Sequence, residues 1–420
     1  MVKQYHFTTK GNFMKKLLLA AALGVTASTV GAQALTISGW LHGSVDQFSI
    51  SNPGATRTGN KSETRITDNV SRVIFRVTEN LNSDLQAVGQ FDLRFALDAA
   101  VRYGANDLPT ATQHHPVSNP MTSGNNHIGL VSKRLGAVRL GRQDLHYVET
   151  ASFNPAAATT LVNSTNLLHS VGTTPIANWS RTPNLIWYTS PTLAGFTTTL
   201  GYSTNPTRTS GGYMEQENDM ATNQRSGSGT YLRLGYAWRD LNVAYSQYLS
   251  KSDWINSGTI SAGTSANATA QNVSDRDGRI VTAKYAVTKN VSVGVARAEN
   301  VSRITAAVNN GQESKQNATQ LGVGYTTGAH TLAFTHTRKD DLQVGGVKSA
   351  DTGANQNTLV YGYALSPRTS VSVGYVVLSN ESKATNGLFY NSENAMGSYG
   401  STALAGEKHK AMTVGLRHNF

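Results

Sequence analysis

The sequence predicts an all-β fold: a 16-stranded antiparallel transmembrane β-barrel with short turns at one end and long loops at the other. Three observations predict it: an alternating final segment, many further alternating segments, and an N-terminal export signal. In the final segment, 412–420, apolar side chains alternate with Thr, Gly, Arg and Asn, and the last residue is Phe420. This is the apolar-out, polar-in pattern of a transmembrane barrel strand.

The N-terminus reads as a secretory signal. Two lysines, a short apolar run and an A-x-A motif follow one another over residues 15–34. The apolar run is shorter than the roughly 20 residues that a membrane-spanning helix needs. We therefore expect a signal peptide, residues 1–34, and a barrel domain, residues 35–420. Met14 directly precedes the two lysines and is an alternative start.

Composition is compatible with export to a membrane. Removing the signal removes four lysines and no acid, which lowers the net charge from +11 to +7. The chain has no cysteine, so disulfides cannot stabilise it in an oxidising compartment. The basic residues are interspersed in alternating segments without a basic run, which argues against a nucleic-acid partner.

Sixteen segments alternate strongly enough to be predicted as strands. They are 35–48, 71–80, 84–96, 126–133, 136–143, 184–190, 195–203, 229–238, 241–250, 279–287, 290–299, 316–326, 329–338, 356–365, 368–378 and 408–420. The connections alternate between short and long, and the long ones include 49–70, 97–125, 204–228, 251–278 and 379–407. Barrels of the bacterial outer membrane have short periplasmic turns and long extracellular loops, so we expect both termini on the periplasmic side.

Basic residues recur at the polar positions of these strands. A charge on the lipid face of a barrel costs roughly 2–4 kcal/mol near the midplane, so these side chains are expected to line the lumen. The predicted lumen cations are Arg72, Arg76, Arg94, Arg139, Arg233, Lys284 and Arg417.

Within these segments stand five specific motifs: Leu35-Thr-Ile-Ser-Gly-Trp-Leu, Ser71-Arg-Val-Ile-Phe-Arg-Val with Glu79, Gly136-Ala-Val-Arg-Leu-Gly-Arg-Gln143, Tyr188-Thr-Ser-Pro191 with Gly195-Phe196, and Phe420. Through these motifs the chain resembles the general, non-specific porins of Gram-negative bacteria, in particular the type of Neisseria, Bordetella and their relatives. The match departs at Val77 and Thr78, where such porins usually carry glycine, and at Trp187, which replaces their usual arginine in the sixth strand.

The resemblance implies a homotrimer of 16-stranded barrels, each with a water-filled pore for small hydrophilic solutes. It also implies that residues 144–183 form a third loop that folds into the lumen as a constriction. By the same resemblance, Phe420 is the signal read by the barrel-assembly machinery.

The predicted constriction loop contains only Asp144 and Glu149 as acids, alongside His146, His169 and Arg181. A basic lumen without a strong acidic wall favours anions by electrostatic focusing. We therefore expect a weak to moderate anion preference, with small anionic and neutral solutes. Further expected partners are lipopolysaccharide, through exposed Lys and Arg, and phospholipid around the barrel.

Two alternatives remain open from the sequence. One is an 18-stranded substrate-specific channel, which would line its path with aromatic side chains; Trp40 and Trp187 are the candidates. The other is a barrel-borne outer-membrane enzyme, for which His114 and His115 are a conceivable metal pair. The main prediction includes no catalytic residue, cofactor or metal.

Overall fold

The computed structural model describes residues 34–52, 62–95, 97, 124–151, 153–176, 181–204, 206, 218–219, 224–225, 228–251, 274–304, 311–388 and 403–420. The predicted signal peptide lies outside these residues except for Ala34. Most of the predicted loops 97–125, 204–228 and 251–278 also lie outside them, together with His114 and His115.

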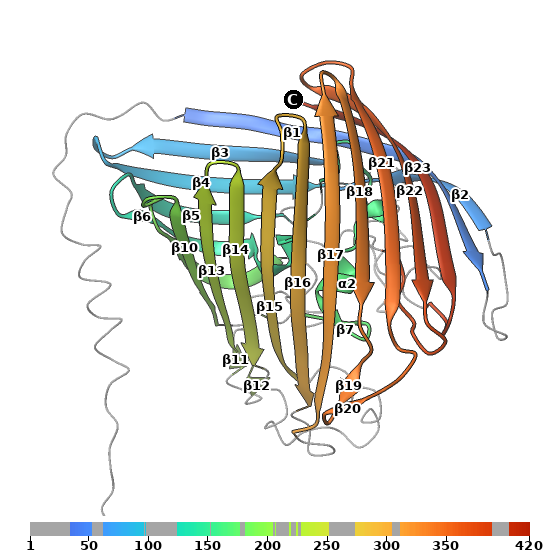
Figure 1. Ribbon diagram of the computed structural model, residues 1–420. Helices are drawn as coiled ribbons and strands as arrows, with labels where there is room; N and C mark the ends of the chain where they lie inside the picture. The colour runs from blue at the N-terminus through green and yellow to red at the C-terminus, as the bar shows by residue number, and fades with distance from the viewer. Residues whose placement is uncertain are drawn as a thin grey trace, which may run out of the picture.

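Sixteen long strands form one antiparallel barrel in which each strand pairs with its neighbours along the chain (Figure 1). They are β1 (Ala34–Ser51), β3 (Arg72–Asn80), β4 (Leu85–Arg94), β5 (Asn126–Ser132), β6 (Gly136–Asp144), β9 (Arg181–Thr189), β10 (Phe196–Ser203), β13 (Ser228–Trp238), β14 (Leu241–Lys251), β15 (Ser274–Ala286), β16 (Val291–Ile304), β17 (Glu313–Thr327), β18 (His330–Lys339), β21 (Ala354–Ala364), β22 (Thr369–Asn380) and β23 (Lys408–Asn419). The predicted strand number is confirmed, and the 18-stranded alternative is wrong.

The first and last strands close the barrel. β1 pairs with β23 from Trp40 opposite Asn419 to Ser51 opposite Lys408, and its first half pairs with β3 on the other side. Beyond the end of β23, Gly39 and Phe420 exchange two backbone hydrogen bonds of 3.1 Å. The barrel wall therefore has no unpaired edge at this seam, as a strand structure in lipid requires.

The two faces of the wall differ as the alternation predicts. On β17 the side chains of Leu321, Val323 and Tyr325 point outward and are exposed, whereas Gln320 on the opposite face is buried. All of the sixteen strands except β3 and β14, whose outward apolar side chains are half-buried, contribute apolar side chains to this exposed outer surface. An exposed apolar surface that encircles a barrel is a lipid-facing belt.

The wall differs in height around the barrel. The wall strands β3, β4, β5, β6, β9 and β10 have 7–10 residues each, and strands β13 to β17 have 11–15. The predicted strands were too short at the extracellular ends of β15, β16 and β17. In the structure β15 and β17 begin earlier in the chain than predicted, and β16 ends later. Their outer ends carry outward-facing charges such as Asp277, Arg303 and Lys315, so the apolar alternation stops before the strand does.

Several short elements were not predicted. β2 (Ser62–Asp68), in the predicted loop 49–70, pairs with the outer half of β1, and Ile66 is its one exposed large apolar residue. β19 (Gln343–Val344) and β20 (Val347–Lys348) form a hairpin between β18 and β21. β11 (Asn218–Asp219) pairs with β12 (Gln224–Arg225). None of the helices in the described ranges is long and apolar enough to cross a membrane.

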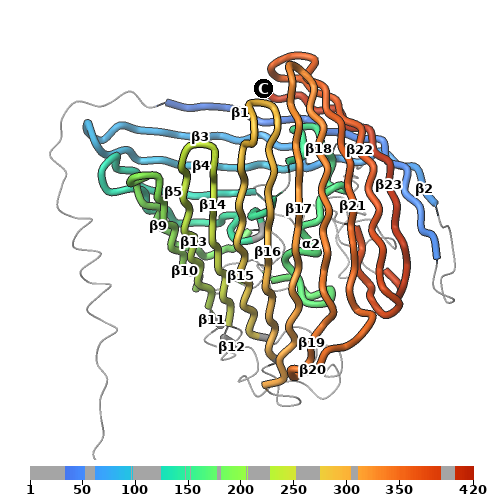
Figure 2. The backbone as a smooth tube through the Cα atoms, in the orientation of Figure 1, coloured from blue at the N-terminus to red at the C-terminus, as the bar shows by residue number. Residues whose placement is uncertain are grey.

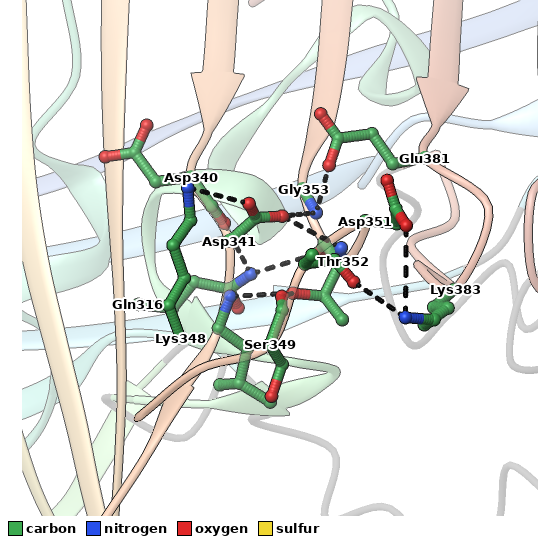
Figure 3. A network of polar contacts seen from close by, with 12 residues as sticks. Gln316, Asp340, Asp341, Lys348, Ser349, Asp351, Thr352, Gly353, Glu381 and Lys383 are labelled. Carbon is green, nitrogen blue, oxygen red and sulfur yellow. Dashed lines mark hydrogen bonds and ion pairs between the residues drawn. The ribbon is translucent and has the colours of Figure 1, made fainter. Parts of the chain in front are cut away.

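Polar contacts fix the connection between β18 and β21 (Figure 3). The Asp341 carboxylate accepts hydrogen bonds from the backbone N–H groups of Thr352 (2.9 Å) and Gly353 (3.1 Å) and pairs with Lys348 at 3.1 Å. Glu381 also accepts from the Gly353 N–H, at 2.9 Å. Burial opposes ionisation of Asp341, but Lys348 and the backbone donors prevail and lower its pKa to about 2.

The assignment of the two wall faces predicts effects of different size for the same substitution at neighbouring positions. Val281→Lys on β15 places a charge on the lipid face, where Val281 is 48% exposed, and should destabilise the barrel by about 2–4 kcal/mol. Thr282→Lys on the same strand faces the lumen and should cost less than about 1 kcal/mol. Urea unfolding of the protein in liposomes, followed by the gel mobility of the folded barrel, measures both. Equal losses would contradict the face assignment.

Candidate channel constriction

The connection between β6 and β9 lies inside the barrel. Its described residues, 145–151 and 153–176, form the constriction loop. In Figure 2 this green segment runs behind the tubes of β16 to β18, and its contacts place it against their inner face. It contains η2 (His146–Val148), η3 (Thr160–Val162), α2 (Thr165–Leu168), β7 (Ser170–Val171) and β8 (Thr174–Pro175).

The outgoing half of the constriction loop packs into a slot that only glycine can form. A Cβ added to Gly322 would lie 2.7 Å from the Phe153 ring, one on Gly294 would lie 2.9 Å from it, and one on Gly324 would lie 3.0 Å from the Phe153 Cβ. A Cβ on Gly362 would lie 2.6 Å from Pro155. Real Cβ atoms do not approach other heavy atoms so closely, so these inward glycines allow the loop to lie flat on the wall.

The returning half is held by buried glutamines that point inward from β17. The Gln320 side chain accepts from the Ala151 N–H at 2.8 Å and donates to the Ser164 hydroxyl at 2.6 Å, which joins the two halves of the loop. Gln316 accepts from the Gly172 N–H at 2.8 Å. Because a buried amide without partners is costly, these contacts favour a single docked position of the loop.

A fully buried lysine fixes the tip of the loop. Lys339 Nζ donates to the Gly172 carbonyl (2.6 Å), the Ser170 hydroxyl (2.7 Å) and the Asn386 side-chain oxygen (3.1 Å). The predicted strand ended one residue before Lys339, so its alternation did not place this lysine in the lumen. Three acceptors use all three donors of the ammonium group.

Two histidines of the constriction loop pack against each other. The rings of His146 and His169 lie edge to face, with centroids 4.9 Å apart. His146 Nδ1 hydrogen-bonds the Ser246 hydroxyl at 2.7 Å, and His169 Nε2 hydrogen-bonds the Glu149 carbonyl at 3.1 Å. Burial, and then the neighbouring His169, lower the pKa of His146 well below its usual value; burial lowers the pKa of His169 to about 4 against the opposing effect of its hydrogen bond.

The loop makes these contacts with β14 to β18 and reaches β21 to β23 and β1, so the inner face of β3 to β6 lies across the lumen from it. On that face, Arg76 donates to Gln90 at 2.9 Å and to Ser38 at 3.0 Å. Arg139 lies opposite Trp187 in the β6–β9 register. In the described part of the chain, neither arginine has a carboxylate within ion-pair distance.

Arg72 and Arg417 enclose an aromatic ring. Each guanidinium carbon lies 4.2 Å from the centre of the Trp40 ring, within the range of a cation–π interaction. Arg72 also pairs with Asp92 at 3.1 Å, and Arg417 donates to the Ala156 carbonyl of the constriction loop at 3.1 Å. Trp40 therefore supports two cations and does not offer a free aromatic surface to a solute.

The remaining predicted cations are placed differently. Arg94 shares Asp92 with Arg72, at 3.3 Å, and its side chain is almost buried. Arg233 is hydrogen-bonded to Glu149 of the constriction loop. Lys284 Nζ lies 4.1 Å from the centre of the Phe153 ring. Asp144 ends β6 opposite Arg181, away from Arg76 and Arg139. Phe420 lies at the barrel seam; its role in assembly stays a prediction.

Sequence reasoning missed the residues that dock the loop. Gln316 and Gln320 stand on the polar face of a predicted strand, where the alternation marks them only as inward, and Lys339 stands just beyond the end of its predicted strand. A signal was present in the inward glycines of the same strands, such as Gly294 and Gly322, because small residues on an inner wall indicate that something packs against them.

A closed antiparallel barrel with a lipid-facing belt and a charged, loop-narrowed lumen defines a water-filled transmembrane channel. Residues 19–383 match a family model described as Gram-negative porin, so the chain belongs to that family. It is a protein of the bacterial outer membrane.

Solved structures with the same fold include the anion-selective porin from Comamonas acidovorans, with 20% identity, a TM-score of 0.66, and coverage of 93% of this chain and 100% of that chain. The trimer form of OmpT, an outer membrane protein of Vibrio cholerae, has 15% identity, a TM-score of 0.59, and coverage of 93% and 100%. Salmonella typhi OmpF in complex with daunomycin has 17% identity, a TM-score of 0.56, and coverage of 92% and 97%. No curated protein sequence matches the chain.

The histidine pair predicts that acid loosens the constriction loop. The docked loop holds both rings neutral, so its stability is fully present above pH 6.5. Below pH 6.5 the undocked loop takes up protons that the docked loop cannot, and His169 alone should cost about 3 kcal/mol by the time its pKa of about 4 is reached. Hydrogen–deuterium exchange of residues 145–176, corrected for intrinsic rates, should increase between pH 7 and pH 4.5.

The matched control is the double variant His146→Gln/His169→Gln, which removes both rings and keeps His42, whose Nε2 hydrogen-bonds the Ala157 carbonyl of the loop at 3.1 Å. Its corrected exchange should change less between the two pH values than that of the wild type. A wild-type loop that exchanges equally at pH 7 and pH 4.5 would show that the buried rings do not control docking.

Proposed function

We propose that this porin is a trimeric, weakly to moderately anion-preferring channel for passive diffusion of small hydrophilic solutes. One observation carries the proposal: the lumen cations Arg76 and Arg139 have no carboxylate partner among the described residues, whereas Glu149 of the constriction loop is already paired with Arg233. A constriction with a net positive charge lowers the entry barrier for anions. The family and the fold are those of a channel, and diffusion needs no catalysis.

The preference is proposed as moderate because part of the positive charge of the lumen is compensated by carboxylates. Arg72 and Arg94 share the buried Asp92, and Arg233 is matched by Glu149. Opposite charges within about 4 Å largely compensate each other for a passing ion. The selectivity therefore rests on few uncompensated cations and should weaken at high salt.

The proposed partners follow from the outer surface. Assembly as a trimer is supported by family membership and by the low wall of β3 to β10, whose short strands suit a position away from the full lipid thickness. Lipopolysaccharide phosphates are proposed to contact outward-facing cations such as Lys408 and Lys410 at the extracellular end of β23. Phospholipid surrounds the apolar belt, and Phe420 serves the assembly machinery.

The test is reversal potential and single-channel conductance in a planar bilayer under a KCl gradient. The wild type should show triplet steps and a reversal potential of the sign that favours chloride. Arg76→Ala/Arg139→Ala should shift the permeability ratio toward one, since it removes both uncompensated cations of the β3–β6 face.

Lys289→Ala, in an exposed periplasmic turn, removes a charge outside the lumen and should leave the ratio unchanged. A wild-type reversal potential that favours potassium would overturn the anion preference. Single steps instead of triplets would overturn the trimer.

A further inference from the structure

The inner wall of β10, β13, β14 and β15 contains a recess of about 230 Å³ on the periplasmic side of the constriction loop. Strand register explains why it exists. Thr197 pairs with Gly235, Gly235 with Ala244, and Ala244 with Thr282, so one row across four strands has hydroxyls at its ends and almost no side chain in its centre. Thr150 of the constriction loop also lines the recess, next to Ala151.

Cations stand on both sides of this row. Arg233 lies one step toward the extracellular side, and Lys284, paired in register with Asn242, lies one step toward the periplasm. The Arg233 guanidinium lies over Gly235, because a Cβ there would be 2.6 Å from Arg233 Nη1 and 2.8 Å from the Thr197 hydroxyl oxygen. The glycine thus forms the floor on which the guanidinium rests beside a hydroxyl.

The net charge of the recess is positive. Glu149 is paired with Arg233, whereas Lys284 has an aromatic neighbour, Phe153, and no carboxylate within ion-pair distance in the described part of the chain. A ligand with a single negative charge therefore matches the uncompensated ammonium group. The hydroxyls of Thr197 and Thr282 and the amide of Asn242 add donors and acceptors for hydroxyl groups.

We propose that this recess is a binding subsite for small hydroxylated monocarboxylates on their way through the channel. The proposal rests on the anion preference described above and adds a solute class to it. The carboxylate binds between Lys284 and Arg233, and the ligand hydroxyls contact Thr197, Thr282 and Asn242. The recess is smaller than the roughly 300–1,000 Å³ of sites for drug-sized ligands, which restricts it to metabolite-sized anions.

The experiment measures reduction of single-channel conductance in 0.1 M KCl by gluconate, with propionate as a monocarboxylate without hydroxyls and inorganic phosphate as a different anion. Gluconate should reduce the wild-type conductance at the lowest concentration. Lys284→Ala should raise the half-effective gluconate concentration about tenfold, because it removes the charged partner. Gly235→Ala should remove the effect by filling the recess floor.

Thr282→Val keeps the side-chain shape and removes one hydroxyl, so it tests the site even if Gly235→Ala does not fold. It should raise the half-effective gluconate concentration about threefold and leave that of propionate unchanged. Lys289→Ala, which lies outside the recess, should behave as wild type. Unchanged gluconate sensitivity in Lys284→Ala and Thr282→Val would overturn the site, and equal effects of gluconate and phosphate would overturn the ligand class.

Reversal potentials recorded on the same channels separate this proposal from the proposed function. If the wild type favours chloride but its gluconate response is unchanged by these substitutions, only the proposed subsite is overturned. If the wild type favours potassium, the anion preference on which the subsite rests is overturned.

Discussion

Closure of the sheet is the constraint on which everything else in this protein depends. In a bilayer an unpaired strand edge would leave backbone N–H and C=O groups without partners, at a cost of several kcal/mol for each group. The pairing of β1 with β23, extended by the Gly39–Phe420 hydrogen bonds, removes that edge. Once the wall is closed, alternation assigns every side chain either to lipid or to the lumen.

The lumen then has to be narrowed without a conventional core. In this protein a loop packs on the inner wall, and the wall has small residues where the loop lies against it. Inward glycines receive Phe153 and Pro155, and buried glutamines and Lys339 satisfy the loop's backbone groups. The resulting apolar cluster, which includes Leu161, Val162 and Leu167, lies between the loop and the wall.

The strands could be predicted from the sequence because period-two alternation is a local property. The errors occurred where alternation loses its apolar half: at the charged outer ends of β15 and β16, and in β2, whose outward residues are mostly polar. The inward position of Arg76 or Arg139 was also readable from parity. Alternation does not predict which side chains contact each other across the barrel. The pairing of Arg233 with Glu149 and the enclosure of Trp40 by Arg72 and Arg417 depend on the path of the loop and on strand stagger.

The electrostatics of the channel depend more on which basic residues have an acidic partner than on the number of basic residues. A guanidinium that shares a buried carboxylate, as Arg94 does, contributes little field beyond its neighbours, whereas an uncompensated cation such as Arg139 or Lys284 acts on the solvent in the lumen. Among the cations without a carboxylate partner in the described residues, Arg76 and Arg139 lie on the β3–β6 face across from the loop, Arg417 lies against Trp40, and Lys284 lies beside the recess below the loop. Under the anion preference proposed above, an anion that passes Arg76 and Arg139 then meets Lys284, where the hydroxyls of Thr197 and Thr282 are further partners. General attraction of anions and recognition of a particular solute can thus reside at different depths of one pore.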